Sequence, residues 1–325
     1  NKYKKKSILW YLVYLDKNLP NKISENIILY QPIKNKFPNL ILLLVYILRN
    51  LKNIFISLEY FVFSISSQSI LADQISKNFS KYTNSNKEIK NVYIPYEGQP
   101  FQNEIIRLIK NYIPKAKITG YIHAPPQPIP TNLLKKCNKP HTIIVNGNDQ
   151  KNCMKKLLGW KNNDILVKPS SRFLTQNSMK KKNIYLPVNI SNKKKVLSCL
   201  KKLQKLNYIN LHDYKIKVHP AAMGSNNISY LVKSISEIKK NKLKFKKNVL
   251  FQDCIIFIGM TGGIIEALER NIKLIHITQD NEIDMYNKDI WPNIIAEKLY
   301  DNIYIYKLKK KGQMLKFGTN KTKYF

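Results

Sequence analysis

The C-terminal half of this chain contains predicted strands that lead directly into turns of small or polar residues. This feature constrains the possible folds of the chain more than any other. Residues 214–218 predict a short strand that ends at His219. Residues 254–258 predict a buried strand that continues through residues 259–263 into a helix. Strands that alternate with helices favour a parallel α/β sheet. Ligands of such sheets bind at the carboxyl ends of the strands, which is the expected position of His219 and residues 259–263.

The same alternation extends over most of the chain. Further strands are predicted at residues 27–30, 91–94, 117–122, 142–145 and 184–188. Apolar residues at helical spacing predict helices at residues 103–112 and 193–206. The proline-rich residues 124–130 predict a loop, because proline lacks the N–H group that helices and sheets need.

A polar and basic stretch from Asp164 to Asn183 interrupts this pattern. We therefore predict two α/β domains, comprising residues 1–170 and 171–325, which is an ordinary domain size. The chain begins with Asn1 rather than Met, which leaves open a truncated start and an N-terminal signal.

The chain is strongly basic, with a formal net charge of +36. Such a charge favours an anionic partner, either nucleic acid, a membrane surface or an anionic acceptor. Only four of the 56 basic residues are arginine, the residue better suited to bidentate recognition of phosphates and bases. We therefore expect no nucleic-acid partner, and we favour an anionic membrane face or an anionic acceptor.

Two apolar stretches, residues 40–48 and 54–65, are shorter than the ~20 apolar residues of a membrane span. They predict either two core helices or a basic, apolar surface that rests on the inner membrane face. The four cysteines form no CxxC pair, which favours a reducing compartment and argues against a zinc site. We expect a cytoplasmic protein, with peripheral contact to the inner membrane as the open alternative.

His219 and Pro220 form the first candidate site. Small residues follow them and leave room for a ligand, and an imidazole can present a proton to a phosphate leaving group. The alternative is a surface histidine that precedes a turn-forming proline.

Thr261, Gly262 and Gly263 form the second candidate site. Backbone N–H groups at a helix start can approach a phosphate, and the Thr261 hydroxyl adds a donor. The alternative is an ordinary N-cap in a tight turn. Glu266, about one helical turn later, either accepts the hydroxyls of a ribose or is an acid that complements the helix dipole.

Glu97 is the third candidate, because it follows a predicted strand and precedes a helix. Its carboxylate can remove a proton from an acceptor hydroxyl, and the alternative is a loop acid in a turn. His123 follows another strand at the corresponding edge. Ser170 and Arg172 can reach an anionic substrate from the segment between the domains.

The sequence contains no Asp-x-Asp pair and no His, Asp and Glu cluster with metal-ligand spacing. The serine and cysteine residues also lack the context of a hydrolase nucleophile. We therefore expect neither a metal nor a cofactor, and we expect electrostatic stabilisation from His219 and the helix start instead.

Glu97-Gly98, His219-Pro220 and the Thr261 turn, in this order, resemble motifs of bacterial sialyltransferases, polysialyltransferases and related Kdo-transferase-like proteins of surface-carbohydrate biosynthesis. The resemblance covers residues 90–280. It implies a GT-B fold, in which two Rossmann-like domains face an interdomain cleft, the N-terminal one on the acceptor side. By the same resemblance, Glu97 is the general base, and His219 and Thr261 bind the phosphate of a CMP-sugar.

The resemblance further implies a metal-independent, inverting glycosyltransferase that acts on capsule or lipopolysaccharide glycans, free or lipid-linked. The third motif has Met260-Thr261 where those families have Ser-Ser or Ser-Thr, which leaves other nucleotide sugars and CDP-glycerol open as donors. Two other hypotheses remain at this point: a CDP-glycerol-type phosphotransferase, and a non-enzymatic basic module that binds membrane or nucleic acid.

Overall fold

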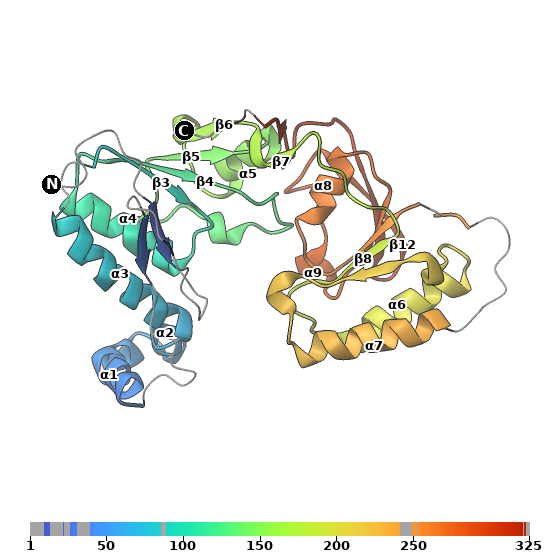
Figure 1. Cartoon of the computed structure of the whole chain (residues 1–325), viewed down its shortest axis with the longest axis horizontal. Coiled ribbons are helices and arrows are strands. Elements are labelled where there is room, and N and C mark those ends of the chain that lie inside the picture. The colour runs from blue at the N-terminus through green and yellow to red at the C-terminus, as the bar shows by residue number, and fades with distance from the viewer. Residues whose placement is uncertain are drawn as a thin grey trace. The chain divides into compact units, whose positions relative to one another are not determined.

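The chain folds into two compact units (Figure 1). The computed structural model describes residues 10–13, 22, 27–30, 40–85, 89–240, 249–251, 253–320 and 322. The first unit comprises residues 1–120 and 136–141, and the second comprises residues 121–135 and 142–325. Helices and parallel strands alternate along the described residues, which confirms the predicted α/β class. The domain division after residue 170 stays a prediction.

The first unit begins with a short parallel pair, β1 (Trp10–Val13) and β2 (Ile27–Tyr30). Helical segments follow, namely α1 (Leu40–Asn50), the 3-10 helix η1 (Leu51–Phe55), α2 (Leu58–Ser64) and α3 (Ser67–Ser85). The predicted strand–helix–strand pattern then forms as β3 (Asn91–Pro95), α4 (Pro100–Tyr112) and β4 (Lys117–Tyr121). Strands β3 and β4 are neighbours in one sheet, and α4 packs against α3.

Helix α4 shows why this part of the sequence folds locally as predicted. Pro100 occupies the first turn, where its missing N–H group costs nothing. Gln99 and Gln102 form a reciprocal capping box with the backbone. Ile106 and Ile109 lie on the buried face of the helix. The helix begins three residues earlier than predicted because its cap precedes the apolar pattern.

The two apolar segments of residues 40–65 do not form core helices, and that interpretation was wrong. Among the side chains that the structure describes between residues 43 and 65, only Tyr46 is buried. The second segment is also split, into η1 and the short helix α2. Of the helices within the described ranges, none has the length and apolar character to cross a bilayer.

The second unit contains two small sets of parallel strands. Strands β5 (Thr142–Val145) and β6 (Ile165–Val167) pair in parallel and are connected through α5 (Asn148–Leu157). Strand β7 (Ser170–Leu174) pairs with β14 (Phe317–Gly318) near the C-terminus. The last part of the chain therefore returns to residues that lie about 145 positions earlier in the sequence.

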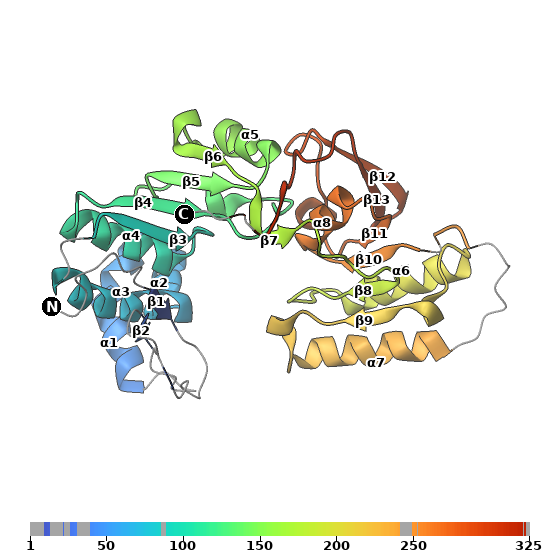
Figure 2. The same cartoon turned by 45° about the horizontal axis from the view of Figure 1, so that its top comes forward.

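The larger sheet of the second unit has six strands in the order β12-β13-β11-β10-β8-β9, as Figure 2 shows. Four of them are parallel, namely β8 (Asn183–Tyr185), β9 (Lys215–Lys217), β10 (Ile255–Ile258) and β11 (Leu274–Ile277). The antiparallel strands β13 (Ile303–Leu308) and β12 (Ile294–Tyr300) complete one edge.

Strands β10 and β11 are buried along their whole length, as expected for central strands of a parallel sheet. Helices α6 (Lys193–Lys205) and α7 (Asn226–Lys240) contribute apolar side chains to one core with these strands. The short helix α8 (Gly263–Glu269) packs against β10, β11 and β13. This core fixes the positions of the loops that follow the parallel strands.

Candidate functional site

The strand order of the larger sheet places a topological switch point between β8 and β10. From β8 the chain continues to β9 on one side, and from β10 it continues to β11 on the other. In open α/β sheets the ligand crevice lies outside the carboxyl ends of the strands at such a point. The segment that follows β10 is residues 259–263, which we call the β10 turn. The β10 turn is therefore the centre of the candidate site.

The β10 turn begins with a glycine in a conformation that other residues rarely adopt. Gly259 has φ +64°, in the left-handed region. A Cβ atom at this position would lie 2.6 Å from Nε2 of Gln279. Glycine at position 259 is thus explained both by its backbone conformation and by the close approach of Gln279.

His276 holds the first residue of the β10 turn from the neighbouring strand β11. Its Nε2 lies 2.9 Å from the carbonyl oxygen of Gly259, which can only accept, so Nε2 carries the proton. Its Nδ1 then accepts from the hydroxyl of Tyr306 at 3.0 Å. Complete burial lowers the pKa of His276 to about 4, so the ring is neutral near pH 7. The tautomer and the orientation of the ring are fixed.

Two further side chains hold the next residues of the β10 turn. The buried carboxylate of Asp284 accepts hydrogen bonds from the backbone N–H groups of Met260 and Gln279, the latter at 2.7 Å. Burial raises the pKa of Asp284 above its ordinary value. The hydroxyl of Tyr286 donates to the carbonyl oxygen of Thr261 at 3.3 Å. Three consecutive residues of the turn are therefore each held by a buried polar side chain.

Thr261, Gly262 and Gly263 lie where the sequence predicted a phosphate-binding helix start. The hydroxyl oxygen of Thr261 accepts from the backbone N–H of Gly263 at 3.2 Å, and its hydrogen can donate to a ligand. A Cβ atom on Gly262 would lie 3.2 Å from Pro125, and one on Gly263 would lie 2.9 Å from the ring of Phe257. Both glycines thus have a packing role, and their role in phosphate binding stays a prediction.

The proline-rich loop brings His123 towards the β10 turn. Pro125 packs against Gly262, and the one hydroxyl hydrogen of Tyr286 is shared between the carbonyl oxygens of Thr261 and Pro126, with the latter at 2.8 Å. His123 stands two residues before Pro125 and is half-buried. Tyr286 therefore ties the loop and the turn together, and His123 belongs to the same region of the second unit.

His219 follows β9 and lies at the same edge of the larger sheet as the β10 turn. Two strand spacings separate β9 from β10, which is ~10 Å. The exposed ring caps the short 3-10 helix η5 (Pro220–Ala222), where its Nδ1 accepts from the backbone N–H of Ala221 at 3.1 Å. In the neutral ring the proton is consequently on Nε2, which can donate to an anionic ligand.

Glu97 lies in the first unit, in a tight turn between β3 and α4. The side-chain oxygen of Gln102 accepts from the backbone N–H of Glu97 at 2.8 Å, and Gly98 has φ +69°. The side-chain amide of Gln99 donates to Oε2 of Glu97 at 3.2 Å. Glu97 is half-buried, on a backbone that the cap of α4 holds in place. Its position at the carboxyl end of β3 agrees with the prediction.

Other predicted residues have structural partners. Ser170 is fully buried, and its hydroxyl oxygen accepts from the backbone N–H groups of Arg172 and Phe173 at 3.2 and 3.0 Å. Glu266 forms an ion pair of 3.0 Å with Arg270. Arg172 is exposed. Their roles in ligand binding stay predictions, and Ser170 and Glu266 also stabilise the second unit.

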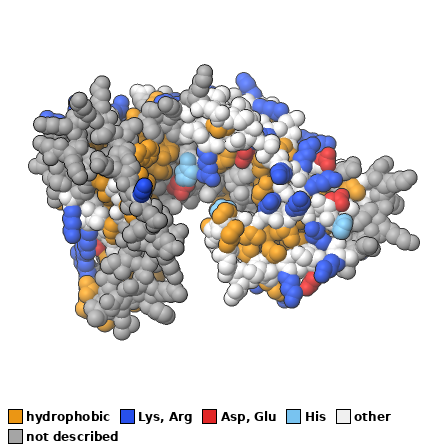
Figure 3. Space-filling view, viewed as in Figure 1, with side chains coloured by type: hydrophobic (Ala, Val, Ile, Leu, Met, Phe, Trp, Pro, Cys, Tyr) orange, Lys and Arg blue, Asp and Glu red, His pale blue; other side chains and the backbone are white. Residues whose placement is uncertain are grey.

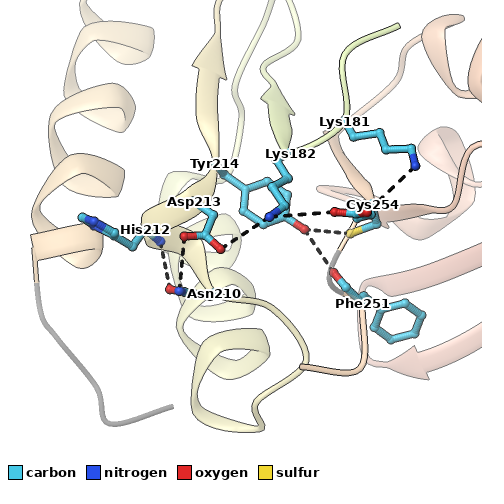
Figure 4. A network of polar contacts seen from close by, with 9 residues as sticks. Lys181, Lys182, Asn210, His212, Asp213, Tyr214, Phe251 and Cys254 are labelled. Atoms are coloured by element: carbon cyan, nitrogen blue, oxygen red, sulfur yellow. Dashed lines mark hydrogen bonds and ion pairs between the residues drawn. The ribbon is translucent and has the colours of Figure 1, made fainter. Parts of the chain in front are cut away.

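A separate polar network lies at the opposite, amino-terminal edge of the sheet (Figure 4). Lys182 pairs with Asp213 at 3.7 Å and with Asp253 at 3.8 Å. The hydroxyl of Tyr214 lies 2.9 Å from the sulfur of Cys254. These residues precede β8, β9 and β10, so they tie together the starts of the strands and are not part of the candidate site.

The structure therefore brings His219, His123 and the β10 turn into one unit and places Glu97 in the other. Sequence reasoning missed His276, Asp284 and Tyr286. The signal for His276 in the sequence was a histidine within an apolar strand, because a buried imidazole needs hydrogen-bond partners.

Within the described ranges, no group of three or more His, Cys, Asp or Glu residues could hold a metal ion. Comparisons with protein-family models, curated proteins and solved structures found no match to this chain.

Proposed function

We propose that this chain is a glycosyltransferase that moves a sialic-acid-like or Kdo-like sugar from a CMP-activated donor to a cell-surface glycan or a lipid-linked glycan. The β10 turn at the switch point carries the proposal. Its backbone is held by His276, Asp284 and Tyr286, and such preorganisation is what an anion site needs.

In the proposed reaction, the second unit binds the donor. The Nε2–H of His219 and the hydroxyl of Thr261 donate to the phosphate of the donor. These donors stabilise the negative charge that develops on the phosphate as the bond between the sugar and the phosphate breaks. CMP leaves with the electron pair of that bond.

Glu97 acts on the acceptor in this scheme. As the acceptor oxygen forms its bond to the anomeric carbon, the carboxylate of Glu97 takes the hydroxyl proton. Attack from the face opposite the leaving phosphate inverts the configuration of the sugar. The scheme requires two Rossmann-like domains of the GT-B type that close on one cleft, and it uses no metal.

A thermal-shift comparison of CMP, CDP, UDP and GDP tests the donor class. A nucleotide at a hundred times its dissociation constant stabilises the folded protein by ~2.7 kcal/mol, so CMP should raise the melting temperature most. His219→Ala should remove most of this shift. His212→Ala, which changes another exposed histidine of the same unit, is the matched control and should retain it.

Each other outcome contradicts the proposal in a defined way. A larger shift with CDP would favour a phosphotransferase that uses CDP-activated alcohols. A larger shift with UDP or GDP would refute the CMP donor. The absence of a shift with all four nucleotides would refute a nucleotide-dependent transferase.

A further inference from the structure

The first unit exposes many large apolar side chains between residues 44 and 63, in α1, in η1, in α2 and in the loop between η1 and α2. The most exposed are Phe55 (92%), Ile56 (69%), Leu58 (69%), Leu48 (67%) and Phe63 (63%). We call this the 44–63 surface. Soluble proteins rarely expose apolar side chains in such density, and surfaces of this kind mark binding sites for membranes or partners.

The 44–63 surface is held by polar contacts on its inner side. Tyr46 is buried, and its hydroxyl donates to Asp73 of α3. Asp73 also pairs with Lys77 at 2.7 Å and with Arg49 at 3.7 Å. Helix α1 is therefore attached to α3 through one face, and the attachment leaves Leu48 on the exposed side.

The loop between η1 and α2 is also ordered by hydrogen bonds. The hydroxyl oxygen of Ser57 caps α2 by accepting from the backbone N–H of Tyr60 at 3.0 Å. The backbone N–H of Ile56 donates to the carbonyl oxygen of Asn53 at 3.1 Å. Phe55 and Ile56 therefore lie on a structured backbone that fixes them at the surface.

The charges on and beside this surface favour an anionic occupant. Residues 40–64 contain Arg49, Lys52 and the single acid Glu59. The side chains of Arg49 and Lys77 are each 60% exposed although both pair with Asp73. Figure 3 shows Lys and Arg side chains next to hydrophobic ones at the lower left, where Figure 1 draws α1 to α3. The whole chain carries a net charge of +36.

We propose that the 44–63 surface docks the protein onto a lipid bilayer that contains anionic lipids. Phe55, Leu58 and Phe63 enter the boundary between headgroups and acyl chains, and Arg49 and Lys52 contact lipid phosphates. Interfacial helices combine an apolar face with flanking cations in this way, and their binding depends on both. Docking of this kind is independent of the donor and of the reaction proposed above.

Vesicle flotation with the full chain tests this proposal. Wild-type protein should bind vesicles of phosphatidylcholine with about a third phosphatidylglycerol at least ~10-fold more strongly than vesicles of phosphatidylcholine alone. The double variant Phe55→Gln/Phe63→Gln should lower binding to the anionic vesicles by ~10-fold or more. The matched control is Leu250→Gln, because Leu250 is 64% exposed on the second unit, and this variant should bind as wild type does.

A second variant gives a direct readout of insertion. Phe55→Trp should show additional fluorescence that brominated lipids quench in anionic vesicles. Circular dichroism should be the same for all variants, because the substituted side chains are exposed.

Three results would overturn the proposal. Wild-type protein that does not float with anionic vesicles would remove the bilayer as the occupant. Equal binding by the double variant and by Leu250→Gln would remove the 44–63 surface as the contact. A wild-type dimer in sedimentation that the double variant converts to a monomer would assign the surface to a second copy of the chain.

Discussion

Replacing His276 with glutamine should flatten the dependence of stability on pH between about pH 4 and 6.5. Glutamine offers an amide N–H for the carbonyl oxygen of Gly259 and an amide oxygen for the hydroxyl of Tyr306. It therefore preserves the two hydrogen bonds that the structure shows for His276. It cannot take up a proton in this range, so the variant separates the titration of the ring from its packing.

The magnitude follows from the pKa of the buried ring. Burial lowers the pKa of His276 from 6.5 to about 4, and each tenfold change in an acid constant corresponds to ~1.4 kcal/mol. Above pH 6.5 the ring is neutral in both states, and the full stability is present. Between pH 6.5 and 4 the unfolded chain takes up a proton that the folded chain refuses, so the free energy of unfolding falls as the pH falls. The total loss is ~3 kcal/mol.

Urea denaturation at several pH values between 4 and 7.5 measures this loss. Wild type and His212→Gln, which changes an exposed histidine, should lose the same amount of stability. His276→Gln should lose ~3 kcal/mol less than either over this range. Burial also raises the pKa of Asp284 and of Asp149, so these two groups make the free energy of unfolding rise as the pH falls, opposite to His276. Comparing the variants with wild type removes these contributions, because all three proteins share them. Equal pH dependence in all three proteins would refute a buried, neutral His276.

Three further substitutions test other parts of the second unit. Gly259→Ala should lower the free energy of unfolding by roughly 1–2 kcal/mol, because φ at this position is +64°, in the left-handed region that disfavours residues with a Cβ atom. Unchanged stability in urea denaturation would contradict that conformation. Tyr286→Phe should lower the free energy of unfolding by ~1 kcal/mol and weaken CMP binding in calorimetry, because the Tyr286 hydroxyl connects the proline-rich loop to the β10 turn. An unaltered affinity for CMP would exclude a role of this connection in binding. Glu269→Gln should lower the free energy of unfolding by ~1.5–3 kcal/mol in urea denaturation, because the buried carboxylate accepts from the backbone N–H groups of Gly312, Met314 and Leu315. Equal stability of Glu269→Gln and of the exposed control Glu237→Gln would count against this contribution.

The strands of the second unit could be predicted because their local pattern and their burial agree. Residues 255–258 and 142–145 are short apolar runs that end at turn residues, and both form strands that pair in parallel with neighbouring strands. The predicted strand at residues 184–188 is shorter in the structure, ending at Tyr185, two residues before Pro187. Its carboxyl end nevertheless lies at the expected edge of the sheet.

The surroundings of the candidate site could not be predicted from local patterns. His276 bonds to residues 17 and 30 positions away, and only the strand order brings these groups together. Pro125 packs on Gly262 although more than 130 residues separate them. The sequence left the exposure of residues 44–63 undecided between a core and a surface, because an apolar run has the same pattern in both.

Transfer of sugar from a CMP-activated donor to an oligosaccharide acceptor tests the central claim most directly, with Glu97→Gln compared with wild type. Glu104→Gln is the matched control, because Glu104 lies on α4, the helix that follows Glu97, and pairs with Arg107. Glu97→Gln should bind the donor with wild-type affinity, and its turnover should be lower by ~10²–10⁴-fold. Addition of a chelator to the wild-type protein should not lower its turnover. Glu104→Gln should retain wild-type turnover. Full turnover in Glu97→Gln would contradict the role of Glu97 as the base. A wild-type protein that transfers no sugar from CMP-activated donors would contradict the account as a whole.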